Sequence, residues 1–330
     1  MPIFDLTFRG PLHLGVFRGV FREEVLEWIP SDSLYAALIN AWSLLGNPIE
    51  EQLQGSNLQI TSLFPRANDV RFYPAPPYMP EFVYLGHHSP KKVKQIRWLS
   101  QGVFDQLCRG EAPKYSPECM LHGGSIWAAP DEMVKLKKCI QGERLWCTQV
   151  VPHVTIDRMS QTPNLHYTGR LVFAPNCGLW FGARGDMQGV HDALTYMMDA
   201  GLGGLRSIGH GAFTYNEQNF ELPAPESGWG ICLSRYAPAS KDELERALQS
   251  TNSAYRLTTV GGWCQDGNSR AWRRRSVRLV EEGSILPHNV RGKLVDVKPL
   301  DLEGWIGDLH PVYRSGLAFL VPAGAFVEVK

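Results

Sequence analysis

A glycine-rich stretch contains the residues best suited to do chemistry. Residues 201–211 read Gly-Leu-Gly-Gly-Leu-Arg-Ser-Ile-Gly-His-Gly, after an expected helix and before an expected strand. Glycine permits positive φ and lets a ligand approach the backbone closely, and successive N–H groups in such a loop can form a concave anion site. Arg206 adds a positive charge and Ser207 adds a hydroxyl donor. We therefore predict contact with nucleic-acid phosphates, the alternative being a tight helix-to-strand turn.

Two familiar phosphate motifs are excluded for this stretch. A dinucleotide fingerprint needs glycine at the position of Arg206 and opens a helix after a strand, and a Walker-type loop needs Gly-Lys followed by Ser or Thr. A small-molecule enzyme that binds a nucleotide here is thereby disfavoured. The residues of the stretch that we expect to contact RNA are Gly203, Gly204, Arg206, Ser207, Gly209 and His210.

Residues 152–158 form an extended segment with one polar face. Val154 and Ile156 are its apolar members, and the polar ones are His153, Thr155, Asp157 and Arg158. Imidazole and guanidinium groups stack on or hydrogen-bond to the splayed bases of single-stranded RNA. We expect these four side chains to contact RNA, the alternative being a buried pair of Asp157 with Arg158 that stabilises the fold.

Basic residues gather in two runs, although the formal net charge is zero and so does not itself indicate nucleic-acid binding. Residues 256–298 carry nine basic and four acidic residues, and Arg273 and Arg274 are the candidates there for an RNA or protein contact. The other run could be a thumb-like element against the RNA backbone, and its basic residues are Lys91, Lys92, Lys94 and Arg97. The alternative for both runs is a solvated surface.

The first expected helix, residues 34–45, begins after Ser31, Asp32 and Ser33. Free N–H groups and the helix dipole favour a phosphate at such a terminus, so Ser31 and Ser33 are RNA candidates. Asp32 opposes that role, and an ordinary N-cap by Ser31 or Asp32 is the alternative.

Periodicity predicts an α+β fold, with a first domain close to a ferredoxin-like unit and a second, smaller α+β domain. Residues 1–222 show a strand (1–14), a helix, a strand (58–64), a hairpin (165–173 with 178–183, turning at Pro175-Asn176), a helix (190–200) and a strand (212–215). A long insertion at about 66–130 interrupts this domain, and its prolines rule out a central strand. Residues 223–330 form the second domain, with strands at 228–235, 255–263, 276–280 and 317–321 and a helix that Ser240 and Glu243 open as a capping box.

The chain resembles the RAMP family, the RNA-binding proteins of CRISPR systems. The glycine-rich stretch is similar to the family's glycine loop, and residues 31–38 resemble the Ser-Asp-x-Leu opening of its first helix. Residues 152–158, 91–110, 261–263, 282–284 and 310–314 resemble one branch, the fourth subunit of the type III-A (Csm) effector complex. The matches run from residue 31 to residue 314.

The resemblance implies two ferredoxin-like (RRM-like) domains and a non-catalytic subunit that binds the 5′ handle of the guide RNA (crRNA). It also implies contacts with the large polymerase-like subunit and with the adjacent backbone RAMP subunit, and target RNA as an indirect partner. No cofactor is expected. The first residues show no signal peptide, no run is long enough for a membrane span, and seven cysteines follow no disulfide framework, so we expect a cytoplasmic protein.

Two catalytic alternatives remain open. A RAMP endoribonuclease that processes repeat RNA needs a histidine acid and base, for which His13, His153 and His210 are candidates, although nothing pairs them in sequence. A metal site has weaker support, because Cys119 and His122 have zinc-like spacing but a strong site shows two such pairs. We therefore expect no metal.

Overall fold

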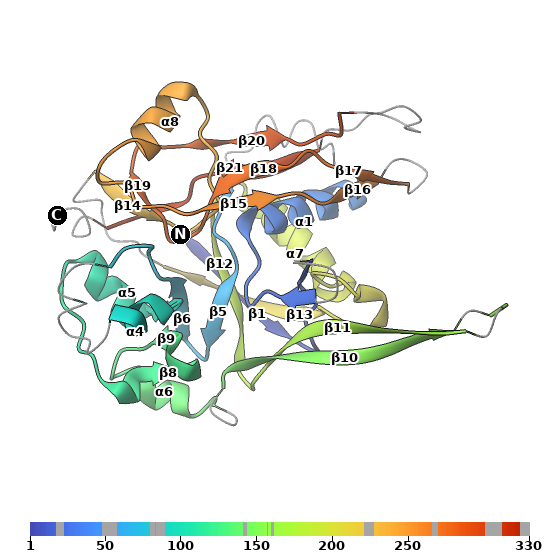
Figure 1. Cartoon of the computed structure of the whole chain (residues 1–330), viewed down its shortest axis with the longest axis horizontal. Coiled ribbons are helices and arrows are strands. Elements are labelled where there is room, and N and C mark those ends of the chain that lie inside the picture. Colours follow the sequence, from blue (N-terminus) through green and yellow to red (C-terminus); the bar gives the residue numbers. More distant parts are fainter. Residues whose placement is uncertain are drawn as a thin grey trace.

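The computed structural model describes residues 1–17, 23–47, 58–79, 83, 90–140, 144–156, 158–159, 162–220, 228–265, 270–300 and 312–323. A mixed sheet runs through the first half of the molecule (Figure 1). Its strands are β1 (Pro2–Phe8), β4 (Gln59–Ile60), β5 (Phe64–Ala67), β6 (Val70–Pro74), β7 (Trp98–Ser100), β8 (Met120–Leu121), β9 (Ile126–Trp127), β12 (Cys177–Arg184) and β13 (Phe213–Asn219). Their order is β13-β1-β12-β5-β6-β7-β9-β8, and β4 pairs with β12.

Two helices predicted from the sequence cover the β1 region of this sheet. They are α1 (Ser31–Leu44) and α7 (Met187–Ala200), and they pack against each other. Phe4 of β1 stacks on Phe181 of β12 and meets His191 of α7 edge-on. Gly201 ends α7 with a φ of 80°, as expected of a glycine after a helix. The predicted first strand, both helices and the last strand correspond to β1, α1, α7 and β13, whereas the predicted strand at residues 58–64 is divided between β4 and the first residue of β5.

The segment expected as an insertion extends the main sheet. It supplies β6, β7, β8 and β9, the helices α4 (Pro90–Gln95) and α5 (Gln101–Cys108), and the short 3-10 turns η1 (Pro117–Cys119) and η2 (His122–Gly124). The prediction that its prolines rule out a central strand is wrong for Pro74. That residue is the last of β6 and pairs with Trp98. At the end of the strand, its missing backbone N–H does not interrupt the strand interior.

A long hairpin projects from the body (Figure 1). Its strands are β10 (Trp146–Ile156) and β11 (Pro163–Phe173), which pair along all their residues, and α6 (Met133–Lys137) precedes it. The hairpin predicted between residues 165–173 and 178–183 is therefore wrong. A turn does exist there, with Asn176 at a φ of 61°, but β12 leaves it to pair with β1 and β5.

The second half is a smaller α+β unit. Its elements are β14 (Trp229–Cys232), α8 (Lys241–Leu248), β15 (Leu257–Val260), β16 (Trp263–Gln265), β17 (Ala271–Arg273), β18 (Val277–Val280), β19 (Ile285–Pro287), β20 (Gly292–Asp296), β21 (Tyr313–Leu317) and β22 (Leu320–Pro322). Strands β19-β14-β22 form one sheet, and β15–β18, β16–β17 and β20–β21 form pairs. Ser240 caps α8 as predicted, whereas the Glu243 carboxylate accepts the backbone N–H groups of Arg291 and Gly292 instead of completing a capping box.

Candidate nucleic-acid interface

The glycine-rich stretch forms a loop that is fixed at both ends and exposed at its tip. Gly204 donates its N–H to the carbonyl of His13 at 2.9 Å, and Leu202 donates to the carbonyl of Gly211 at 3.0 Å. Gly211 has a φ of 79°, and a Cβ there would lie 2.0 Å from the Leu202 oxygen, so only glycine fits. The loop is therefore rigidly attached to the segment that follows β1.

The tip of the loop presents polar groups to solvent. It is a 3-10 turn, η3 (Arg206–Ile208), with Leu205 and Gly209 in the left-handed region on either side. The side chains of Arg206 and Ser207 are exposed. Alternation of right-handed and left-handed backbone is the geometry in which N–H groups converge on an anion. The loop is a helix-to-strand turn, and its exposed tip leaves the predicted anion site open as a second role of the same residues.

Three histidines far apart in the sequence gather beside this loop. Burial lowers the pKa of His210, and the nearby Arg170, His13 and His153 lower it further. The Nδ1 of His210 is buried without a hydrogen-bond partner among the described residues. The Nδ1 of His13 lies 2.7 Å from the carbonyl oxygen of Gly169 in β11. The loop, the segment after β1 and the base of the long hairpin therefore form one polar surface.

The register of the long hairpin places polar side chains on one face and apolar side chains on the other. Pairing of His153 with His166 and of Gln149 with Arg170 gives one polar face, and the two imidazoles stack with centroids 5.5 Å apart. The opposite face is apolar and exposed, with Val150, Pro152, Val154, Ile156, Leu165 and Tyr167. We call these two surfaces the polar face and the apolar face of the hairpin.

The RNA candidates of residues 152–158 thus lie on the hairpin. His153 and Thr155 belong to its polar face, and Arg158 is exposed beyond the end of β10. Asp157 lies outside the described residues. The exposure of Arg158 removes the alternative of a buried Asp157–Arg158 pair, because one of its two members is in solvent.

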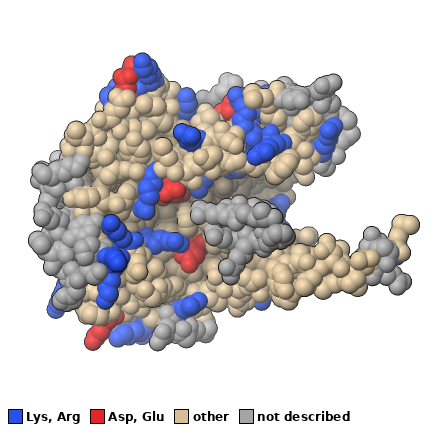
Figure 2. Space-filling view, viewed as in Figure 1, with Lys and Arg blue, Asp and Glu red and all other residues tan. Residues whose placement is uncertain are grey.

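A cleft of about 1200 Å³ lies between the two halves of the chain. Figure 2 shows Lys and Arg side chains gathered at the middle of this face, where the halves meet. Its polar and aromatic lining includes Trp28, Ser33, Lys94 and Arg97 from the first half and Arg235, Arg256, Trp263, Glu281, Glu282 and Arg314 from the second. The candidates Lys94 and Arg97 therefore meet the C-terminal half across this cleft.

The long hairpin, and not the run of residues 91–97, is the element that projects from the body (Figure 1), and the expected contact of that run with the RNA backbone stays a prediction. Lys91, Lys92 and Lys94 are exposed on α4, which packs on the sheet extension. Arg97 follows that helix and lies 3.7 Å from the Glu27 carboxylate. The run is thus a helix beside the cleft.

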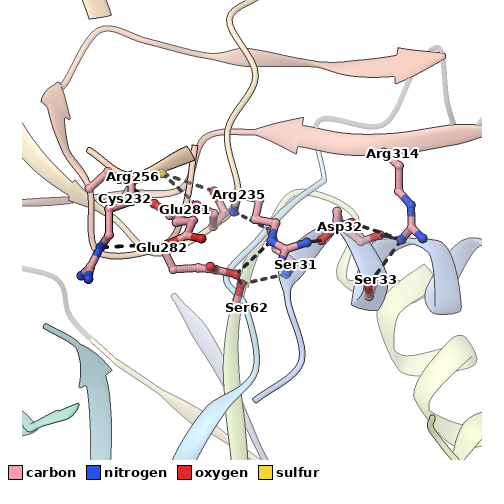
Figure 3. Close-up of polar contacts among 12 residues, drawn as sticks. Ser31, Asp32, Ser33, Ser62, Cys232, Arg235, Arg256, Glu281, Glu282 and Arg314 are labelled. Atoms are coloured by element: carbon pink, nitrogen blue, oxygen red, sulfur yellow. Dashed lines mark hydrogen bonds and ion pairs between the residues drawn. The ribbon is translucent and has the colours of Figure 1, made fainter. Parts of the chain in front are cut away.

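The start of α1 has a structural role that the sequence did not reveal (Figure 3). Pro30 is the N-cap, and the predicted capping by Ser31 or Asp32 is wrong. Ser31 is 1% exposed, and its hydroxyl accepts the backbone N–H of Arg235 at 2.8 Å. The RNA role predicted for Ser31 therefore conflicts with its burial between the two halves, whereas Ser33 is half-buried at the edge of the cleft.

Asp32 is the centre of this contact between the halves. Its Oδ1 accepts from Nη1 of Arg235 at 2.9 Å, and its Oδ2 lies 3.2 Å from Nη1 of Arg314. The hydroxyl of Ser62 donates to Glu282 at 2.6 Å, and that carboxylate lies 3.7 Å from Nε of Arg235. We call Asp32, Ser62, Arg235, Glu282 and Arg314 the interdomain cluster.

The remaining basic candidates lie on the β16–β17 arm. Arg273 is exposed at the end of β17. Arg274 follows it, and its Nη2 donates to the carbonyl of Gly261 at 3.2 Å. The cleft residues Trp263, Arg235, Arg256 and Arg314 were not among the candidates, and the signal that could have found Trp263 is an indole directly after two glycines in a basic segment.

The residues with zinc-like spacing have other contacts. Nε2 of His122 accepts the backbone N–H of Leu145 at 2.7 Å, and Cys119 is buried. In the part of the chain that the structure describes, no three His, Cys, Asp or Glu side chains are placed to hold a metal ion. The same residues include no helix long and apolar enough to cross a membrane.

Comparison with known proteins gives one consistent family. Residues 226–323 match the family described as the CRISPR Csm4 C-terminal domain. The CRISPR system Cms protein Csm4 of Thermococcus onnurineus (strain NA1) is 25% identical over 316 residues, which cover 92% of this chain and 92% of that protein.

Solved structures match over almost the whole chain. One is a chain of a Csm3–Csm4 subcomplex in the type III-A CRISPR-Cas interference complex, with a TM-score of 0.66, 17% identity, and coverage of 98% of this chain and 99% of that chain. Another is a chain of a Csm1–Csm4 cassette in complex with cA4, with a TM-score of 0.58, 18% identity, and coverage of 98% and 97%.

Over almost its whole length the chain has the fold of a chain from type III-A CRISPR complexes. Residues 226–323 match the Csm4 C-terminal domain, and the chain is similar in sequence to a Csm4 protein.

Proposed function

We propose that this chain is a non-catalytic subunit of a type III-A interference complex that binds the 5′ handle of the crRNA. The observation that carries the proposal is the exposed tip of the glycine loop, with Arg206 and Ser207, next to the polar face of the long hairpin. A fixed loop with exposed donors suits phosphates, and histidines on a projecting strand suit unstacked bases.

The proposed division of work follows this geometry. Arg206 and Ser207 hold handle phosphates through their exposed side chains. Gly203, Gly204 and Gly209 let the RNA backbone approach closely, while the N–H groups of Gly204 and Gly209 are donated to the carbonyls of His13 and Arg206. His153, Thr155, Asp157, Arg158 and His210 position bases. The strand order β13-β1-β12-β5 with α1 and α7 supports a ferredoxin-like first domain at residues 1–222, and residues 223–330 form the second domain of the proposal.

The proposed partners are the large polymerase-like subunit and the adjacent backbone RAMP subunit, with target RNA reached indirectly and the cytoplasm as the location. Matches to chains from Csm3–Csm4 and Csm1–Csm4 structures support both protein contacts. The apolar face of the hairpin also supports a protein contact, because Val150, Val154, Ile156 and Tyr167 are 58–63% exposed there. We assign that face to the backbone subunit.

A second candidate function, cutting of repeat RNA, has one observation in its favour. His13 is bridged to Gly204 of the glycine loop that also contains His210, and His13 and His153 contribute to the lowered pKa of His210. A histidine pair can act as general base and general acid. Arg170 nearby could stabilise a developing charge. The binding function remains the main proposal, because the family matches name a subunit of an assembly.

The test is a gel-shift titration of the full chain with labelled repeat RNA and with its 5′-handle fragment at two salt concentrations. Salt-sensitive binding without cleavage is expected. Arg206→Ala should reduce the salt slope by about 0.7, the share of one phosphate on a single strand. Lys241→Ala, whose side chain is 87% exposed on α8, is the matched control and should bind as wild type.

Two results would count against the proposal. Cleavage without metal that is lost in His210→Ala would replace binding by endoribonuclease activity. Equal salt slopes for wild type, Arg206→Ala and Lys241→Ala would remove Arg206 from the interface. If the wild type does not bind alone, the same three proteins are compared after co-purification with the other subunits.

A further inference from the structure

The interdomain cluster and the neighbouring Arg274 together have more positive than negative charge. Arg235 and Arg314 share the single carboxylate of Asp32, and Glu282 faces Arg235. Burial lowers the pKa of Arg274 to about 10, and the proximity of Arg314 contributes to the shift. Three guanidinium groups are therefore set against two carboxylates.

One donor atom of each of these arginines lacks a hydrogen-bond partner among the residues that the structure describes. The Nε atoms of Arg235, Arg274 and Arg314 are buried and make no hydrogen bond to any residue that the structure describes. Arg314 is 9% exposed and lines the cleft. Buried charged donors without acceptors are costly, and an anion that enters the cleft would supply both charge and acceptors.

The lining of the whole cleft also has more positive than negative charge. Its lining includes five cations, Lys94, Arg97, Arg235, Arg256 and Arg314, against two carboxylates, Glu281 and Glu282. The partners of the outer cations are loose, since Nε of Arg256 lies 4.0 Å from Glu281. Its Nη2 donates to the carbonyl of Ala75 at 3.5 Å, and the side chain is 58% exposed, so these two long contacts can be exchanged for contacts with a ligand.

An exposed indole stands at the same cleft. Trp263 begins β16 and is 66% exposed. The preceding Gly262 has a φ of 122°, and a Cβ there would lie 2.3 Å from Nη2 of Arg274. Arg274 thus crosses the two glycines and holds the backbone from which Trp263 projects. A fixed, exposed indole beside cations is the arrangement that stacks nucleic-acid bases.

We propose that this cleft is a second ligand site, which takes one nucleotide with an unpaired base, its phosphate at Arg256 and Arg314 and its base on Trp263. The cations of the cleft would suit an acidic peptide as well as a nucleotide. The exposed indole of Trp263 favours a nucleotide, because a nucleobase can stack on it. The volume of about 1200 Å³ is ample for a nucleotide. Only the assignment of the nucleotide to crRNA rests on the proposed function.

The cleft is continuous with the glycine loop. Leu14 and Gly15 line the cleft, and the preceding His13 accepts the N–H of Gly204. Gly15 also opens β2 (Gly15–Phe17), which pairs with β3 (Glu23–Val25). A single strand held at the loop can therefore reach the cleft along residues 13–15.

The test measures tryptophan fluorescence and affinity of the full chain with handle RNA and, separately, with AMP. Four variants are compared: Trp263→Phe, Trp263→Ala, Arg256→Ala and the charge control Lys241→Ala. Ligand is expected to quench the wild type. Trp263→Phe should keep the affinity, because phenylalanine still stacks on the base. It should lose the part of the quench that comes from the indole of Trp263. Trp263→Ala should weaken binding about tenfold, the loss of one base–aromatic stack, and Arg256→Ala should lower both affinity and salt slope.

The outcomes separate this proposal from the proposed function. Wild-type affinity in both Trp263→Ala and Arg256→Ala, with handle RNA bound, would overturn the cleft site and leave the handle function intact. Absence of RNA binding together with an AMP quench that Trp263→Phe removes would support the cleft as a site for free nucleotides. Absence of a quench by either ligand would overturn it. Because Trp263 and Arg256 are exposed, these variants do not depend on the buried interdomain cluster for folding.

Discussion

Replacement of Asp32 by alanine is the sharpest test of the interdomain cluster. Asp32 is 0% exposed and is shared by Arg235 at 2.9 Å and Arg314 at 3.2 Å. Without it, both guanidinium groups stay buried, and among the described residues only Arg235 still faces a carboxylate, that of Glu282. Removal of one partner of a buried ion pair costs roughly 3–5 kcal/mol. At about 2 °C per kcal/mol for a chain of this size, Tm should fall by about 6–10 °C.

The assay is calorimetry of the full chain beside a matched control. Asp199→Ala also breaks a 2.9 Å pair, with Arg9, but the Asp199 side chain is 81% exposed, so solvent screens the interaction and Tm should hardly change. Arg314→Met in the Asp32→Ala background should recover part of the loss, because it removes one unpaired buried cation.

Two results would refute this reasoning. A Tm of Asp32→Ala within about 2 °C of wild type would mean that the buried charges are solvated in another way. A double variant that loses the sum of the two single losses would mean that Asp32 and Arg314 do not interact. An intermediate recovery, by contrast, would measure the coupling between the two halves of the chain.

Three further outcomes are expected from single substitutions. Gly211→Ala should destabilise the chain by about 1–3 kcal/mol in urea titrations and weaken handle binding, because its Cβ would meet the Leu202 carbonyl. Gly209→Ala has open space around its Cβ and should destabilise the chain less. Equal losses of stability in the two variants would argue against the steric explanation. Burial raises the pKa of Glu282 above its usual 4.5, so the folded state holds the proton more tightly than the unfolded state. The stability of wild type relative to Glu282→Gln should therefore rise as pH falls through the raised pKa toward 4.5. A stability difference that stays constant in calorimetry across that pH window would contradict this expectation. Tyr167→Ser, on the apolar face of the hairpin, should leave Tm unchanged and reduce co-purification with the backbone subunit; unchanged recovery would remove that face from the contact.

Local patterns were sufficient for α1, α7 and α8, but not for the helices α4, α5 and α6 or for the strand pairing of the first unit. The spacing of Leu34, Leu38 and Trp42 predicted α1, and a glycine at position 201 predicted the end of α7. The same patterns do not say which strand pairs with which. Residues 165–173 alternate equally well against β10 and β12, and the choice of β10 depends on contacts distant in sequence.

The candidate site was predicted in part for the same reason. The glycine loop has a signal in consecutive residues, and its exposed Arg206 lies at the tip as a phosphate contact requires. The cleft has no such signal, because its residues come from segments as distant as Ser33 and Arg314. A buried serine and an exposed serine at a helix start look alike in sequence, which explains the wrong expectation for Ser31.

The pairing of the first strand has a consequence for how the chain is made. The Met1 amino group bonds to the Phe220 carbonyl 219 residues away, and Arg314 closes on Asp32 across 282 residues. At about 5–20 residues per second of synthesis, β1 waits roughly 10–40 s for its neighbour β13, with Ile3, Phe4 and Leu6 uncovered. Such non-local closure slows folding. The ribosome-bound chain is therefore expected to need protection, from a chaperone or from a partner subunit made nearby, until its last strands emerge.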